Sequence, residues 1–207
     1  MRLSQSLPAA LDRALAMVRP VSRAVVVGGG AMMLLSALMI AADVLLRRLL
    51  GVSTWGADEL SYYALAISTS WALAFSMLDK AHIRISVLTG MLGPRLRAAC
   101  DIVALLAMGF FALMACEAIF GLLERSWQRG ATSITTLQTP LWIPQGLFLL
   151  GFVFFALVLA LLLLRVLAAL LLERSFETAE LHGGAPTIES ETRAAVEEAA
   201  ALGRGTR

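Results

Sequence analysis

Four long runs of apolar residues, separated by shorter polar segments, dominate the chain. A helix that crosses a hydrocarbon core of about 30 Å needs about 20 mostly apolar residues. Residues 24–46, 60–78, 98–123 and 142–172 meet this requirement. The pattern therefore predicts an all-α integral membrane protein with four transmembrane helices, which together form a membrane domain over residues 24–172.

The fourth run is longer than one membrane crossing requires. A continuous helix over 142–172 would measure about 46 Å at about 1.5 Å per residue, so it must tilt or protrude from the bilayer. We expect Arg165 to mark the inner interface, where its long side chain can extend toward the headgroups.

The distribution of charge predicts the orientation. Apolar residues make up 59% of the chain and charged residues 15%, well below the roughly 25% usual for soluble domains. Thirteen of the seventeen Lys and Arg residues lie before the first run, between the second and third, or from Arg165 onward. Because Lys and Arg accumulate on the cytoplasmic side, both termini are predicted to be cytoplasmic, with loops 47–59 and 124–141 facing outward.

Short segments flank the four runs. Within 1–23, apolar residues recur at helical spacing from Leu7 to Val18, which predicts an amphipathic helix on the inner membrane surface that breaks near Pro20. Residues 82–92 are predicted to form a second interfacial helix, which Gly93-Pro94 ends. Residues 173–207 shift toward acids and alanine, and are predicted to be a disordered, acidic cytoplasmic tail.

The chain offers little reactive chemistry. Its two histidines, His82 and His182, are too few and too scattered for a haem pair or a histidine-based metal site. Cys100 and Cys116 lie on one predicted helix, about 24 Å apart and beyond disulfide reach. Known hydrolase motifs are absent from the sequence, and a net charge of +2 gives no reason to expect nucleic acid as a partner. We therefore expect a non-catalytic protein without cofactor or metal.

Charged residues in or near the spans are the candidate partner contacts. Asp43 precedes Arg47 by four residues, which places both on one helical face. Two interpretations stay open, an ion pair within the helix or a contact of either residue with a partner protein. Glu117 lies a few Å inside the outer edge of the hydrocarbon. It can extend outward beside Glu124 and Arg125, or it can meet a polar group of a neighbouring helix, including one from another subunit.

The stretch RRLLGVSTWGADELSYY, residues 47–63, concentrates charge on the predicted outer face. Arg47 and Arg48 end the first helix, where cations oppose the negative end of its dipole, and Asp58 and Glu59 fall in the first turn of the second, where negative charge is favourable. The same charges are candidate contacts to a partner subunit or a docking protein. The rings of the stretch fit an interfacial aromatic belt: Trp55, Tyr62 and Tyr63.

Two further features are candidates for contacts. Gly28-Gly29-Gly30, in the first run, is a possible close-packing surface, because small residues let helices approach one another. His82, just after the second run, either contacts a partner at the inner interface or caps a short helix and faces solvent.

Several motifs, taken in order, resemble the DctQ-like small membrane subunit of tripartite ATP-independent periplasmic (TRAP) transporters. They are an Arg near the end of the first span, GVSTWGADEL at the start of the second, AHIRI after it and LWIP at the start of the fourth. The resemblance covers residues 24–172. Asp58 stands where the family commonly has Glu, and Ser and Ala within 69–74 replace a glycine-rich patch. The residues that match the family pattern are Arg47 or Arg48, Gly51, Ser53, Trp55, Glu59, Leu60, His82 and Ile83.

The resemblance implies a scaffold in the bacterial inner membrane. Such a subunit binds the large multi-span transport subunit within the lipid bilayer, and a periplasmic substrate-binding protein docks transiently. The complex imports an organic acid, such as a C4-dicarboxylate or sialic acid, by sodium symport. The alternative from the sequence is a stand-alone four-helix membrane adaptor or sensor that signals through its acidic tail.

Overall fold

The computed structural model describes residues 2–52, 56–79, 93–135, 137–173 and 175–183. The helices among them are α1 (Arg2–Leu50), α2 (Ala57–Leu78), α4 (Pro94–Gln128), α5 (Trp142–Ala168), a π-helical turn η1 (Ala169–Glu173) and α6 (Phe176–Gly183). Outside the helices, these ranges contain one isolated antiparallel bridge, between Thr132 and Pro140. The predicted all-α class is therefore confirmed for the described part of the chain.

Three of the described helical stretches are long and apolar enough to cross a membrane. They are Ser6–Leu50, Arg95–Gln128 and Trp142–Leu172, and they contain the predicted first, third and fourth spans. The second predicted span forms α2, whose apolar run is interrupted by serines, a threonine and two tyrosines. Pro94, expected to help end the preceding helix, is instead the first residue of α4, with Gly93 as its N-cap.

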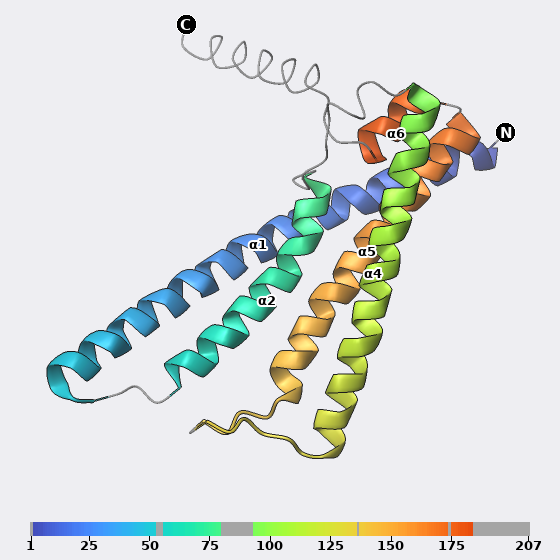
Figure 1. Cartoon of the computed structure of the whole chain (residues 1–207). Coiled ribbons are helices and arrows are strands. Elements are labelled where there is room, and N and C mark those ends of the chain that lie inside the picture. Colours follow the sequence, from blue (N-terminus) through green and yellow to red (C-terminus); the bar gives the residue numbers. More distant parts are fainter. Residues whose placement is uncertain (1, 53–55, 80–92, 136, 174, 184–207) are drawn as a thin grey trace, which may run out of the picture.

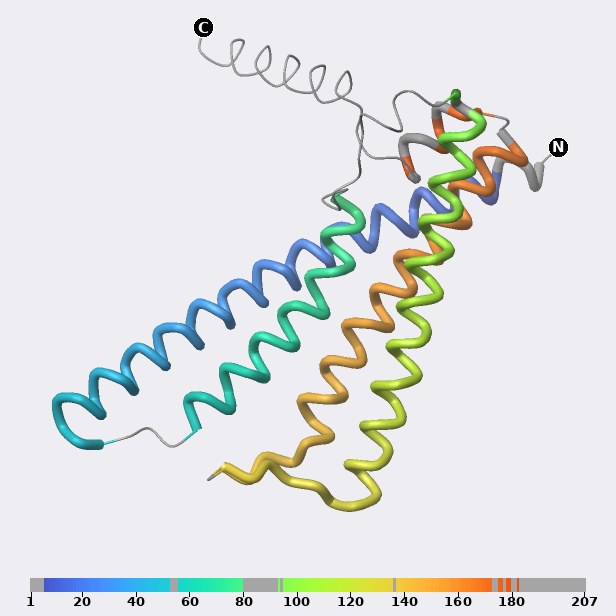
Figure 2. The backbone as a smooth tube through the Cα atoms, in the orientation of Figure 1, coloured from blue at the N-terminus to red at the C-terminus, as the bar shows by residue number. Residues whose placement is uncertain are grey.

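The predicted break near Pro20 is wrong. Figure 2 shows α1 as one continuous helix, with Pro8 and Pro20 inside it. Proline removes a backbone donor and crowds the preceding turn, so it usually ends a helix. Here α1 is held on both sides of Pro20, because Leu15 is buried in the core before it and Gly29 packs against α2 after it. These tertiary contacts outweigh the local preference.

The long helices form two pairs. In Figure 1, α1 lies beside α2 and α4 beside α5, and the pairs separate toward the end that carries the α1–α2 connection. α2 also packs on α5, and the first turns of α1 cross α5 near α6. We call the end with α6 and the start of α1 the α6 end. The opposite end, with residues 131–141 and the first turn of α2, is the hairpin end.

A glycine lets α1 and α2 approach closely. A side-chain carbon added at Gly29 would lie 3.3 Å from Ser68 Cβ, whereas Gly28 and Gly30 face open space. The Ser68 hydroxyl donates to the Gly29 carbonyl oxygen at 3.0 Å, beside its bond to Ala64 at 2.6 Å. The predicted close-packing role of the glycine run is therefore confirmed for its middle residue.

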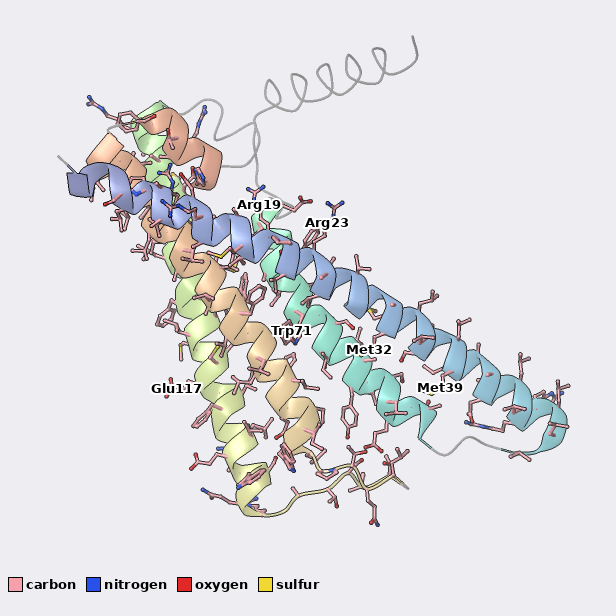
Figure 3. The ribbon with its side chains drawn as sticks, turned by 180° about the vertical axis from the view of Figure 1, so that it is seen from behind. Arg19, Arg23, Met32, Met39, Trp71 and Glu117 are labelled. Atoms are coloured by element: carbon pink, nitrogen blue, oxygen red, sulfur yellow. The ribbon has the colours of Figure 1, made fainter. Side chains whose placement is uncertain are left out.

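A second glycine brings α2 against α5. A carbon added at Gly151 would lie 2.8 Å from Ser70 Cβ and 2.9 Å from the Ser70 carbonyl carbon. Nearby, the Trp71 indole donates to the Leu147 carbonyl oxygen at 2.9 Å, and its ring lies 6.1 Å from that of Phe154. Figure 3 shows Trp71 between these two helices. Small residues on both faces of α2 thus allow it to lie between α1 and α5.

The buried apolar cluster lies toward the α6 end. It is built mainly on α5, and every other described helix adds at least one residue. Its members are Leu15, Ala74, Met77, Leu105, Ala112, Phe155, Val158, Leu159, Leu162, Val166, Ala169 and Ala179.

Part of the predicted disordered tail is ordered. Residues 176–183 form α6, which packs on α4 and α5 and buries Ala179. The helix covers the end of the apolar cluster. A prediction from composition alone does not account for stabilisation by such tertiary packing. The rest of the predicted tail and the predicted interfacial helix at 82–92 lie outside the described residues.

We predict that Gly151→Ala destabilises the protein. The new carbon would overlap Ser70 and its backbone, and such overpacking costs about 1–3 kcal/mol. Gly109→Ala is the matched control, because a carbon at Gly109 meets nothing within 4 Å. Thermal unfolding in detergent, followed by tryptophan fluorescence, should show a lower midpoint for Gly151→Ala alone. Equal midpoints for the two variants would contradict the close packing of α2 on α5.

Candidate functional site

Residues 131–135 and 137–141 form the two sides of a small hairpin. The Ser133 amide donates to Thr139 at 2.9 Å, and the Leu141 amide donates to Ala131 at 3.0 Å. At the base of the hairpin, the rings of Trp127 and Trp142 meet edge to face with centroids 5.0 Å apart. The loop predicted as 124–141 is therefore shorter than expected, because α4 continues to Gln128, and its remainder is an ordered structure.

Glu59 joins this hairpin to α2. Its side chain is buried, and it accepts hydrogen bonds from the Tyr63 hydroxyl at 2.7 Å and from the Thr135 hydroxyl of the hairpin. Gly56, just before α2, has φ of 116°, and any side chain there would overlap Leu137. The helix start and the hairpin thus require both the glycine and the carboxylate. Glu59 has a structural partner within its own chain, in addition to the helix-start position that the sequence indicates.

The other charges of the outer stretch divide into two groups. Asp43 is buried and ion-paired with Arg47, as the four-residue spacing allows. Asp58 lies in the first turn of α2, as predicted, and it is exposed, as is Arg48 at the end of α1. Arg47 keeps 58% of its side chain exposed while it pairs with Asp43. The exposed set available to a partner is therefore Arg47, Arg48 and Asp58.

Two candidates, Trp55 and His82, lie outside the described residues. The neighbouring rings that are described differ from each other. Tyr62 is 69% exposed, whereas Tyr63 is bonded to Glu59. The exposed Tyr62 ring suits the predicted interfacial aromatic belt. Tyr63 also supports the start of α2 through its hydrogen bond to Glu59.

The α6 end has a polar cluster of its own. The Arg165 guanidinium donates to Asp12 through Nε at 2.6 Å and through Nη2 at 3.2 Å. Its side chain is only 5% exposed, and His182 of α6 lies 3.6 Å from the same carboxylate. The cluster connects α1, α5 and α6. Arg165 therefore does not simply extend to the headgroups, as we expected, because an acid from the first turns of α1 reaches it.

Glu117 stands apart from both clusters. It is exposed on α4, and Figure 3 shows it pointing away from the other long helices. Among the described residues it has no hydrogen bond or ion pair. Glu124, one of the residues we placed near it, accepts a hydrogen bond from Gln128 at 3.0 Å instead.

Sequence reasoning missed two residues of these clusters, Thr135 and Asp12. An arginine inside an apolar run requires a partner, so Arg165 could have directed attention to the acid at position 12. No comparable signal marks Thr135, because a threonine in a loop is common and its partner is 76 residues away.

Comparison with known proteins gives one clear result. Residues 36–169 match the family model described as "Tripartite ATP-independent periplasmic transporters, DctQ component". Neither the curated proteins nor the solved structures give a match. The matched range begins within α1 and ends at the first residue of η1, so it contains α2, α4, α5 and the hairpin.

We predict that Thr135→Val loosens the hairpin. The substitution keeps the side-chain shape but leaves a buried Glu59 oxygen without its donor, at a cost of about 1–3 kcal/mol. Hydrogen–deuterium exchange should become faster at the Ser133 and Leu141 amides. Thr132→Val is the matched control, because the Thr132 side chain forms no hydrogen bond with another described residue. Unchanged exchange in Thr135→Val would show that Glu59 does not hold the hairpin.

We also predict that Asp12→Asn destabilises the α6 end. The neutral amide removes the negative charge that Asp12 presents to the buried Arg165 guanidinium, which costs about 2 kcal/mol. The unfolding midpoint in detergent should fall. Asp79→Asn, an exposed position that ends α2, should leave the midpoint unchanged. Similar midpoints for Asp12→Asn and the wild type would show that Arg165 finds sufficient partners elsewhere.

Proposed function

The chain belongs to the DctQ family of TRAP transporter components, and on this basis we propose that it scaffolds the large transport subunit of a sodium-coupled importer. The imported compound in this proposal is an organic acid, such as a C4-dicarboxylate or sialic acid. A periplasmic binding protein delivers it, and this chain takes no catalytic part. The family match is the observation that carries the proposal, because it covers most of the membrane helices.

The surfaces of the outer helices support a scaffold role. α1 and α4 each carry large apolar side chains that remain exposed in the isolated chain. A scaffold requires such faces for a partner and for lipid, and it requires no reactive group. The exposed large residues include Val27, Leu34, Leu35, Leu38, Val44 and Leu45 on α1, and Val103, Leu106, Phe110, Leu113, Met114 and Phe120 on α4.

In the proposed membrane arrangement α2 is the second of four spans, in addition to the three long apolar stretches. It packs against α1 on one side and α5 on the other, so its hydroxyl groups are directed at neighbouring helices and its own backbone. The α6 end carries Arg13, Arg19 and Arg23 on α1, and we place it in the cytoplasm by the positive-inside rule. The hairpin end then faces the periplasm of a bacterial inner membrane.

The exposed charges at the hairpin end are the proposed contacts to the binding protein. Arg47, Arg48 and Asp58 are available there, whereas Asp43 and Glu59 are buried within the chain. Exposed charges of this kind affect mainly the rate of association and the choice of partner. They suit a protein that docks transiently.

We predict that uptake of the organic acid stops when this chain is deleted and returns when it is supplied in trans. The large subunit loses its support in the bilayer, so transport should fall to background even though the transport site lies elsewhere. The measurement is uptake of labelled substrate by proteoliposomes that contain the large subunit with or without this chain, plus the binding protein.

Two controls complete this experiment. A sodium ionophore should abolish uptake, because it removes the sodium gradient. Omission of ATP should leave uptake unchanged. The wild-type chain, solubilised in mild detergent, should also retain the large subunit through affinity purification. Full uptake by the large subunit alone would contradict the scaffold role.

A further inference from the structure

We propose that the outward face of α4 is the surface on which the large transport subunit docks, and that Glu117 there pairs with a Lys or Arg on a membrane helix of that subunit. The inference rests on the proposed function, because it takes the large subunit as the partner. It adds the location of the contact and the chemistry that recognises it.

Between Val103 and Phe120 the surface is a continuous apolar face with one charge in it, Glu117. α4 packs on α5 and α6 with its other side. Large apolar side chains of this stretch are more than half exposed, and Figure 3 shows that Glu117 points away from the other long helices, as this face does. They include Val103, Leu106, Phe110, Leu113, Met114 and Phe120. A face of this kind suits a membrane helix, and the carboxylate requires a polar group on that helix.

Measured from the tryptophans at one end of α4, Glu117 lies deeper than the few Å that we expected from the sequence. Trp127 and Trp142, in contact at 5.0 Å, mark one membrane interface, where tryptophan is enriched. Glu117 precedes Trp127 by ten residues, which corresponds to about 15 Å of helix, or about half of a hydrocarbon core of about 30 Å. A glutamate side chain extends only a few Å, so it cannot place its charge in water.

The described part of the chain holds no ion-pair partner for Glu117. No described residue forms a hydrogen bond or an ion pair with it. The nearest cation along the face is Arg125, whose Nη1 atom would lie 3.7 Å from a carbon added at Gly121, so it extends along the face toward Glu117 without forming an ion pair with it. Because an unpaired carboxylate is costly in lipid, a cation from outside the chain is the partner that best removes this cost.

Other occupants of the face are less favourable. The amine of a lipid headgroup lies at the interface, about 15 Å along the helix from Glu117. A second copy related by a two-fold axis along the membrane normal would place its own Glu117 at the same depth, and the two carboxylates would repel each other. A helix of the large subunit can carry a Lys or Arg at the depth of Glu117, so neither objection applies to it.

The first test is co-purification of the assembled complex in mild detergent. Glu117→Lys would oppose the partner's cation, and should lower the retained large subunit by at least about tenfold. Glu117→Gln keeps the shape and removes the charge, so its loss should be smaller than that of Glu117→Lys. Glu124→Lys is the control on the same helix, and should retain the large subunit as the wild type does. Unchanged retention in Glu117→Lys would overturn the proposal.

The second test does not depend on how the charge variants fold. A photo-reactive phenylalanine analogue replaces Phe110 on α4 or Leu34 on the outward side of α1, and both complexes are irradiated in membranes. The adduct with the large subunit should come predominantly from position 110. An adduct with lipid alone, an adduct with a second copy, or an equal yield from position 34 would overturn the proposal.

The outcomes separate this inference from the proposed function. If the wild-type chain does not retain the large subunit and uptake does not require it, the scaffold role fails. If the wild type retains the large subunit and supports uptake, but Glu117→Lys and position 110 behave as the controls do, only the location on α4 fails.

Discussion

Two glycine–serine contacts let α2 lie directly against both α1 and α5. Gly29 accepts a hydrogen bond from Ser68, and Gly151 leaves room for Ser70 on the other side of α2. Ser70 in turn donates to the Ile67 carbonyl oxygen at 2.9 Å. Because these hydroxyls bond to backbone oxygens, α2 can contain polar residues and still lie between apolar helices. α1 and α4 are therefore the outer helices, and their free faces are what the rest of an assembly can use.

Polar contacts fix the two ends, where the helices cannot rely on close packing alone. At the hairpin end, Glu59 ties α2 to the loop that follows α4; at the α6 end, Asp12 ties the first turns of α1 to α5. Both contacts join segments that are far apart in the sequence. They define the relation between the helix pairs at each end, whereas the pairs separate toward the hairpin end (Figure 1).

The sequence predicted the features that depend on local periodicity. Four apolar runs became four long helices, the acidic first turn of α2 lies where expected, and Asp43 pairs with Arg47. It failed where a distant contact decides the outcome. Pro20 does not break α1, and residues 176–183 form a packed helix. Glu59 likewise resembled a surface charge, because its donor Thr135 lies in a different loop and no spacing rule connects them.

The acids of the chain show how a membrane protein's own structure indicates where a partner is required. Asp12, Asp43 and Glu59 each have a cation or a hydroxyl donor within the chain. The Asp58 side chain has no such partner among the described residues, but it is exposed at a helix start, where water and the helix dipole stabilise it. Glu117 is exposed in the middle of an apolar face instead, where neither water nor a helix end is available. Since lipid cannot solvate a carboxylate, the face that carries it is incomplete without a polar group from another molecule.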